Sequence, residues 1–332
     1  MNLANSKESY ICLSAVLKAR EPKLLSDERA LRVLDAQSFE DAAKQIAECG
    51  YEDMSAMSAA EIGETLSRRR DGILSELDRL CPDKAIVDLF RIKYDYHNIK
   101  SVMKAEAAGT DAGRLLSASG RFPTEKLRED YYNESFSGYP GLFSSAVSES
   151  RETLARTGNP QLADFILDRA YFAELKATAE ASGCSFTEGY VTLLIDTANL
   201  KTVVRTLRMG KDSSFMKDAV IPGGRVEAGR VLKIENAEGI DQSFTDSIIK
   251  NAAQEGAKAV AGGGLTEFEK ACDNAVNTYL KEAKLSAYGP DVVTAYIAAL
   301  ESEITAVRMI LTGILAGISA ESIKERLRDM YA

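Results

Sequence analysis

The sequence has 332 residues with 45% apolar and 27% charged side chains, a composition typical of a folded chain with an ample core. Its 41 basic and 50 acidic residues give a net charge of −9, which argues against nucleic-acid binding because phosphates attract basic surfaces. No stretch approaches the roughly 20 apolar residues that a membrane span requires. The single histidine excludes multi-histidine metal sites, and five scattered cysteines without a Cys-x-x-Cys pair predict reduced thiols in helix interiors of a cytoplasmic protein.

Helix-type patterns run through the first third of the chain, and strand signals are sparse throughout. Amphipathic patterns predict short helices over residues 27–34 and 38–48 and a longer helix over residues 56–80. The run Arg68-Arg69-Arg70 lies in the longer helix. We interpret this run as a solvated helix face and not as a basic patch for nucleic acid.

The clearest pattern follows the break at Cys81-Pro82-Asp83 and predicts a helix over residues 83–108. Its apolar residues recur at intervals of four and three, and Gly109 stands where a helix stops. At about 1.5 Å per residue, this helix is a rod of roughly 37 Å. The apolar stripe consists of Ala85, Leu89, Ile92, Tyr96, Ile99 and Met103, and the polar stripe beside it consists of Asp88, Arg91, Asp95 and Asn98.

The same pattern returns 101 residues later and predicts a second long helix over residues 185–209, closed by Gly210. A leading helix over residues 161–181 precedes it, as the helix over residues 56–80 precedes the first. Agreement in apolar phase, polar residues and stop signal indicates an internal repeat. The shift places Asp95 on Asp196, Asn98 on Asn199, Lys100 on Lys201 and Lys104 on Arg205.

A weaker third copy runs from Val293 to Leu311, with Gly313 as its expected stop and a leading helix over residues 265–287. Glu301, Glu303 and Arg308 stand near the positions of the aspartate, the asparagine and the basic residue, in a register set only to within a few residues. The three pairs of helices predict an all-α chain of three similar helical-bundle domains in tandem. The expected domains are residues 1–110, 111–211 and 212–332.

The repeated polar residues are the candidate functional positions, and two interpretations of them stay open. They could line a polar socket for a partner, or they could form ion pairs between bundles. Acid/base catalysis is disfavoured, because basic residues stand near each aspartate in its own helix and because catalysis rarely needs the same residue in every repeat. The candidates are Asp88, Arg91, Asp95, Asn98, Asp196, Asn199, Lys201, Arg205, Glu301, Glu303 and Arg308.

Other motifs point to structure and not to chemistry. His97 falls inside a predicted helix and is interpreted as a surface residue of that helix. Ile221-Pro222-Gly223-Gly224 is interpreted as a turn into a helix, because no strand precedes it and no Lys-Ser/Thr follows, as a phosphate-binding loop requires. No catalytic residue, metal site or cofactor is predicted.

The order and spacing of these segments resemble the C subunit of the prokaryotic V/A-type rotary ATPases, the family that includes the d subunit of eukaryotic V-ATPases. The resemblance covers nearly the whole chain, although no single piece carries it alone. The matching segments are residues 10–25, Cys49-Gly50-Tyr51, residues 90–100, 161–172, 196–205 and 221–224, Gly289-Pro290 to Tyr296, residues 301–304, 308–313 and 323–328.

The resemblance implies three helical bundles around a pseudo-threefold axis, forming a funnel. It also implies a central-stalk role without catalysis or bound nucleotide. Such a protein is a socket that receives the D and F subunits of the central axle and rests on the membrane proteolipid ring, coupling ATP turnover to proton or sodium transport. It would be cytoplasmic and attached to the membrane only through the complex.

Two alternatives from other classes remain at this stage. A helical-repeat scaffold could bind a protein partner unrelated to rotary ATPases. An enzyme could carry a site that its sequence does not reveal. Binding to the axle favours the stalk role, whereas a thermal shift caused by a nucleotide or substrate favours the enzyme.

Overall fold

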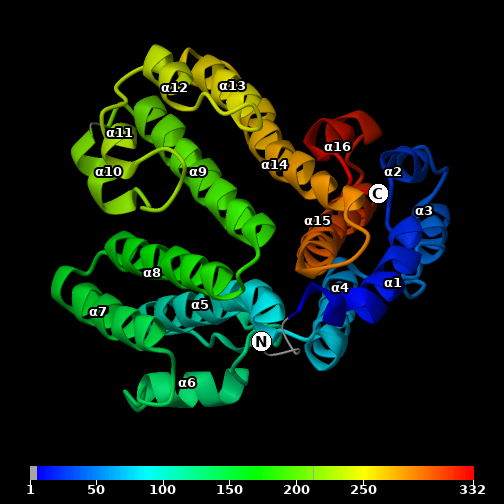
Figure 1. The fold of residues 1–332 in the computed structure, drawn as a ribbon, viewed down its shortest axis with the longest axis horizontal. Coiled ribbons are helices and arrows are strands. Elements are labelled where there is room, and N and C mark those ends of the chain that lie inside the picture. Colours follow the sequence, from blue (N-terminus) through cyan, green and yellow to red (C-terminus); the bar gives the residue numbers. More distant parts are fainter. Residues whose placement is uncertain (1–5, 212) are drawn as a thin grey trace. The chain divides into compact units, whose positions relative to one another are not determined.

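The computed structural model describes residues 6–211 and 213–332, and within these ranges the chain is helical without strands, which confirms the predicted all-α class (Figure 1). The chain divides into two compact units. Unit 1 consists of the described residues up to Val87 together with Thr245–Ala332, and unit 2 is Asp88–Phe244. Within the described ranges, no helix is both long enough and apolar enough to cross a bilayer.

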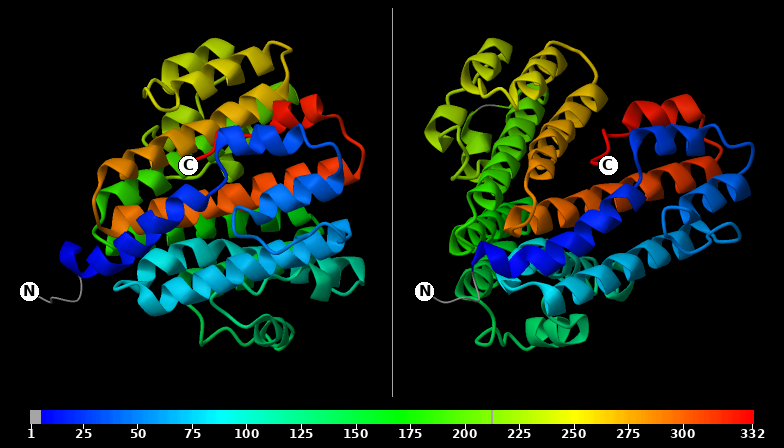
Figure 2. Two further views of the ribbon diagram at one scale, coloured as in Figure 1. Left: turned by 90° about the vertical axis from the view of Figure 1, so that its right-hand side faces the viewer. Right: turned by 45° about the vertical axis from the view of Figure 1, so that its right-hand side comes forward.

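Unit 1 joins the beginning and the end of the chain around the long helix α15. Helices α4 and α15 pack side by side, and α2, α3 and α16 also pack against α15 (Figure 2). Leu25, Ile46 and Leu66 meet Leu300 and Val307 of α15 in one apolar core. The helices are α1 (Ile11–Arg20), α2 (Asp27–Leu34), α3 (Phe39–Ala47), α4 (Ala59–Leu80), α13 (Lys250–Val260), α14 (Leu265–Lys281), α15 (Pro290–Leu315) and α16 (Ala320–Arg326).

Unit 2 is built on two long helices and a hairpin. Helices α7 and α8 form the hairpin, and α9 packs against α8 and α10. The first turn of α5 belongs to unit 1 and the rest of that helix to unit 2. The helices are α5 (Lys84–Ala108), α6 (Thr124–Tyr132), α7 (Gly141–Thr157), α8 (Pro160–Ala181), α9 (Ser185–Arg208), α10 (Ser213–Ala219), α11 (Ala228–Val231) and α12 (Ala237–Ser243).

The predicted helices are present, and their ends follow local signals. Helix α4 begins after Ser58, whose side chain and that of Glu61 form a reciprocal capping box. The third leading helix is shorter than predicted, because α14 ends at Lys281 and a 3₁₀ turn, Glu282–Leu285, follows it. Helix α7 was not predicted, since its four serines weaken the helix signal.

The predicted stop at Gly313 is wrong. Helix α15 continues to Leu315, and Gly317 takes the left-handed conformation after it with φ of 72°. Gly313 instead lies inside the helix against Ile323 of α16, where an added Cβ would stand 2.8 Å from the Ile323 Cδ1. Gly109 and Gly210 do occupy left-handed positions after α5 and α9, as predicted.

The cysteines and the arginine run lie differently from the positions predicted for them. The cysteines are free, but only Cys12 and Cys272 lie within helices, whereas the other three stand at breaks between helices. Of the arginine run on α4, Arg68 is exposed, but the guanidinium of Arg69 lies 3.9 Å from the ring centre of Tyr51. The Arg70 side chain is only 11% exposed, so this run is packed against the protein on one side.

Candidate functional site

Asp95, in the middle of α5, binds the backbone of the loop that leads to α6. Its Oδ1 accepts hydrogen bonds from the amides of Arg121 at 2.9 Å and Phe122 at 3.4 Å. Its Oδ2 accepts from the Arg121 Nε at 2.6 Å. Arg121, and not a basic residue of the same helix, is therefore the ion-pair partner of Asp95. The Nε of Arg91 is buried without a hydrogen-bond partner.

Asn98, one turn further along α5, fixes the same loop at a second point. Its side-chain amide donates to the carbonyl of Ser117 at 2.9 Å, and its Oδ1 accepts from the Ser117 amide at 2.8 Å. The Asn98 side chain thus satisfies both the backbone amide and the backbone carbonyl of Ser117. In a helix or a sheet, other backbone groups would make these two hydrogen bonds.

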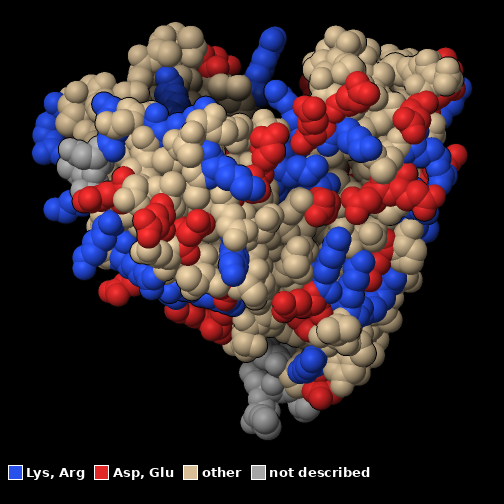
Figure 3. Space-filling model, turned by 90° about the horizontal axis from the view of Figure 1, so that it is seen from above, with Lys and Arg blue, Asp and Glu red and all other residues tan. Residues whose placement is uncertain are grey.

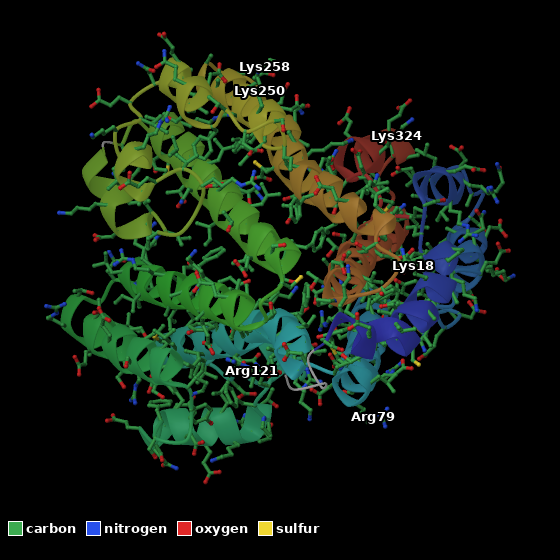
Figure 4. All side chains as sticks on the ribbon, in the orientation of Figure 1. Lys18, Arg79, Arg121, Lys250, Lys258 and Lys324 are labelled. Carbon is green, nitrogen blue, oxygen red and sulfur yellow. The ribbon has the colours of Figure 1, made fainter. Side chains whose placement is uncertain are left out.

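A buried ion network surrounds the first of these contacts (Figure 4 labels Arg121). The Arg121 guanidinium also donates to Glu174 Oε1 at 2.7 Å, and the Tyr96 hydroxyl donates to Glu174 Oε2 at 2.9 Å. Two carboxylates thus share one guanidinium. Burial raises the pKa of Asp95 to about 6, although Arg121 and the amides favour its charged form. Burial and Glu174 raise the pKa of Tyr96, which therefore remains a hydrogen-bond donor.

The second repeat builds the same contacts. Asp196 on α9 accepts from the amides of Arg225 at 3.1 Å and Val226 at 3.2 Å. Asn199 bonds both the amide and the carbonyl of Ile221, each at 2.8 Å. We call each such pair, Asp95 with Asn98 and Asp196 with Asn199, a carboxylate clamp.

Each clamp requires a glycine directly before the arginine. A Cβ on Gly120 would stand 2.4 Å from Asp95 Oδ1, and one on Gly224 would stand 2.2 Å from Asp196 Oδ1. No side chain fits at such a distance. The turn predicted at Ile221-Pro222-Gly223-Gly224 is therefore the segment that the second clamp holds, and it leads to α11 as predicted.

Glu303 on α15 is also buried and bonded within unit 1. Its Oε2 accepts from the amide of Leu25 and its Oε1 from the hydroxyl of Tyr51, both at 2.5 Å. Burial raises the pKa of Glu303, and burial together with Glu303 raises that of Tyr51. The relative exposures are 0% for Asp95, Asn98 and Asn199 and 2% for Asp196 and Glu303.

The other candidates lie nearer the surface. Arg205 and Arg308 are exposed. Asp88, Arg91, Lys201 and Glu301 are partly buried. The structure thus brings together Asp95 with Asn98 and Asp196 with Asn199 in buried positions, whereas Arg205 and Arg308 are the exposed members of the set.

Several residues of these clusters were not predicted. Arg121, Glu174 and Tyr51 come from other elements, and no local spacing points to them. The dipeptide Gly-Arg stands at both Gly120 and Gly224, but it also occurs at Gly113 and Gly229 and so does not identify the clamps by itself. His97 is exposed, as interpreted, and its Nε2 lies 2.9 Å from the carbonyl of Leu115.

Ion pairs also connect α5 with α8 inside unit 2. Lys100 Nζ lies 2.5 Å from Asp168 Oδ1, and Lys104 Nζ lies 2.8 Å from Asp164 Oδ2. Each pair is partly exposed, so its contribution to stability is small.

On the face drawn in Figure 3, acidic and basic side chains are interspersed. Among the described residues, no His, Cys, Asp and Glu side chains gather in a group of three that could hold a metal ion.

Comparison with known proteins places the whole chain in one family. The model of the ATP synthase (C/AC39) subunit family matches residues 13–326. The C subunit of the V-type sodium ATPase of Enterococcus hirae is 23% identical over 97% of this chain and 99% of its own length. The C subunit of the A-type ATP synthase of Methanocaldococcus jannaschii is 24% identical over 96% of this chain and 86% of its own. The C subunit of the V-type ATP synthase of Thermus thermophilus is 22% identical over 96% and 98%. The chain belongs to the ATP synthase (C/AC39) subunit family.

Proposed function

We propose that this chain is a non-catalytic central-stalk component of a V/A-type rotary ATPase. In this role it is a socket between the D and F subunits of the central axle and the membrane proteolipid ring. It is cytoplasmic and attached to the membrane only through the complex. The observation that carries the proposal is the family match over residues 13–326, supported by relatives that align along nearly their full lengths.

The use of the buried carboxylates supports a mechanical role. Asp95 and Asp196 each accept hydrogen bonds from two backbone amides, and each fixes a loop to the middle of a long helix. At about 1.5 Å per residue, the 24 residues of α9 span roughly 36 Å. A part that transmits torque must not deform locally. Bonding loops to rigid helices at two points each meets that need.

The proposed domains remain residues 1–110, 111–211 and 212–332 in a pseudo-threefold arrangement. The duplicated clamp supports the first two repeats, because Asp95 and Asp196 lie at the same distance before Gly109 and Gly210. We propose that partner contacts use the exposed members of the candidate set, above all Arg205 and Arg308. Such contacts favour rapid association and weaken in salt.

Co-purification tests the proposal. The full chain, tagged, is mixed with the D and F subunits and separately with proteolipid rings in detergent. Recovery with both is expected, and recovery with neither contradicts the proposal and favours an unrelated scaffold. Reversing the charge of the exposed arginines, Arg205→Glu with Arg308→Glu, is expected to weaken binding in at least one of these complexes. The loss of binding should be largest at low salt, where charges are least screened. Arg32→Glu, at an exposed position of α2, is the matched control.

A further inference from the structure

The three long helices end in the same way, which sets the register of the third repeat. Gly109, Gly210 and Gly317 follow them with φ of 65°, 65° and 72°. After each glycine the next amide bonds a carbonyl five residues back: Thr110 to Ala105, Lys211 to Thr206, and Ile318 to Gly313. Counting back 14 positions from each glycine reaches Asp95, Asp196 and Glu303. Glu303, and not Glu301, therefore stands in the place of the clamp aspartate.

We propose that Glu303 forms a third carboxylate clamp, and that an N-terminal segment, residues 24–26, fills it in place of the segment that follows α15. Leu25 donates its amide to Glu303, as Arg121 and Arg225 donate theirs to Asp95 and Asp196. The segment also has the same place relative to a following helix. Helices α6 and α11 begin three residues after the arginine, and α2 begins two residues after Leu25.

The longer side chain at this clamp has a steric reason. In the first two clamps a glycine precedes the donor, and the carboxylate approaches to a distance that no Cβ tolerates. In the third, Leu24 precedes the donor and carries a buried side chain. The backbone must then stay farther from α15. The extra methylene of glutamate spans that distance, which an aspartate would leave open.

The asparagine of the clamp is replaced by apolar packing. Three positions after Glu303, where Asn98 and Asn199 stand in the other repeats, the chain has Ala306. Leu25 is 1% exposed and lies in the core that contains Leu300 and Val307. Burial of that side chain takes over the task of fixing the segment. Tyr51 supplies the second donor to the carboxylate.

The segment that follows α15 is bonded elsewhere. After α16 it reaches the start of α2, where the amide of Met330 donates to Asp27 Oδ1 at 2.8 Å. The contact between Leu25 and Glu303 joins residues 278 positions apart, whereas the carboxylates of the first two clamps bind the amides of Arg121 and Arg225, which follow them by 26 and 29 positions. Residues 24–26 are thus a strap that closes unit 1 onto α15, and Glu303 is its positioning residue.

Amide hydrogen exchange of the isolated full chain tests this strap, with Glu303→Gln against the matched control Glu301→Gln. Glutamine has one acceptor oxygen for two donors, the Leu25 amide and the Tyr51 hydroxyl, so exchange at Leu25 is expected to speed roughly tenfold, the effect of one hydrogen bond. Exchange at Arg121 and Arg225 is expected to stay unchanged. Glu303→Asp should behave like Glu303→Gln, since aspartate is too short opposite Leu24.

Several outcomes would overturn the proposal. These are equal exchange at Leu25 in Glu303→Gln and Glu301→Gln, acceleration spread evenly over unit 1, and full protection in Glu303→Asp. If Glu303→Gln does not fold, Tyr51→Phe removes only the donor to Oε1. It should then speed exchange at Leu25 severalfold, and no change there counts against the strap. Because the measurement uses this chain alone, its outcome is independent of the proposed stalk role.

Discussion

The clamps on α5 and α9 make the same backbone contacts in different surroundings. Both hold a loop through one aspartate and one asparagine, and both need a glycine before the donor. At the first, the Arg121 side chain is drawn inward between Asp95 and Glu174, whereas at the second the Arg225 side chain is exposed. The two clamps thus share their backbone contacts, and at the first clamp Arg121, Glu174 and Tyr96 extend those contacts into a buried ion network.

The largest effect is expected where the two clamps are most alike. Gly120→Ala and Gly224→Ala place a Cβ 2.4 and 2.2 Å from the aspartate Oδ1, so each carboxylate must leave its amides. We expect each change to lower the free energy of unfolding by about 3 kcal/mol, the cost of unpaired buried polar groups. Chemical denaturation measures this. Gly229→Ala, with no atom within 4 Å of the new Cβ, is the control. Equal midpoints for all three variants would contradict the account.

The asparagines should separate the two clamps. Asn199→Ala leaves the amide and carbonyl of Ile221 unpaired in a buried place, and we expect a loss of about 2–3 kcal/mol. Asn98→Ala leaves the same groups of Ser117, which water can reach because Ser117 is partly exposed, and about 1 kcal/mol is expected. The order of the two denaturation midpoints checks this. A greater loss for Asn98→Ala would show that exposure does not set the cost.

Burial of Asp95 should give the first clamp a pH dependence. Burial raises the pKa of Asp95 to about 6, above its ordinary value of 3.8, so the folded chain holds this proton more tightly than the unfolded chain. The resulting stability is fully present below pH 3.8 and is lost as pH rises through 6. Integrated over that range it amounts to about 3 kcal/mol at most. As pH rises from about 4 to 7, the unfolding free energy of the wild type should therefore fall relative to that of Asp95→Asn. A flat difference would contradict the shift.

The smallest effect is expected at the edge of the network. Tyr96→Phe removes the donor to Glu174 Oε2 but keeps the ring against Phe143 and Tyr171. We expect a loss of about 1 kcal/mol in unfolding free energy. Tyr132→Phe, at an exposed residue of α6, is the control and should change nothing measurable. A loss as large as that of Gly120→Ala would mean that the network, and not the backbone contact, dominates the first clamp.

The helices and the repeated residues could be predicted because both follow local periodicity. Asp95, Asn98, Asp196 and Asn199 were found from a shift of 101 positions. Their partners were not found, because they are backbone amides. Almost every residue has a backbone amide, so the sequence does not show which one a carboxylate binds.

The third repeat was harder to predict, for a physical reason. Its carboxylate is a glutamate, its asparagine is an alanine, and its partner Leu25 is 278 positions away. The helix also runs past Gly313 because that glycine provides room for Ile323 and does not end a helix. The partner of Glu303 and the end of α15 are therefore set by packing between segments far apart in the sequence, which a local pattern does not reveal.

The proposed stalk role is tested most directly by ATP-driven ion transport in vesicles that contain the rotary complex with and without this chain. The complex lacking the chain is expected to hydrolyse ATP without transporting ions, and adding the chain back is expected to restore transport. Transport that persists at the full rate without the chain, or ATP hydrolysis by the chain alone, would contradict it.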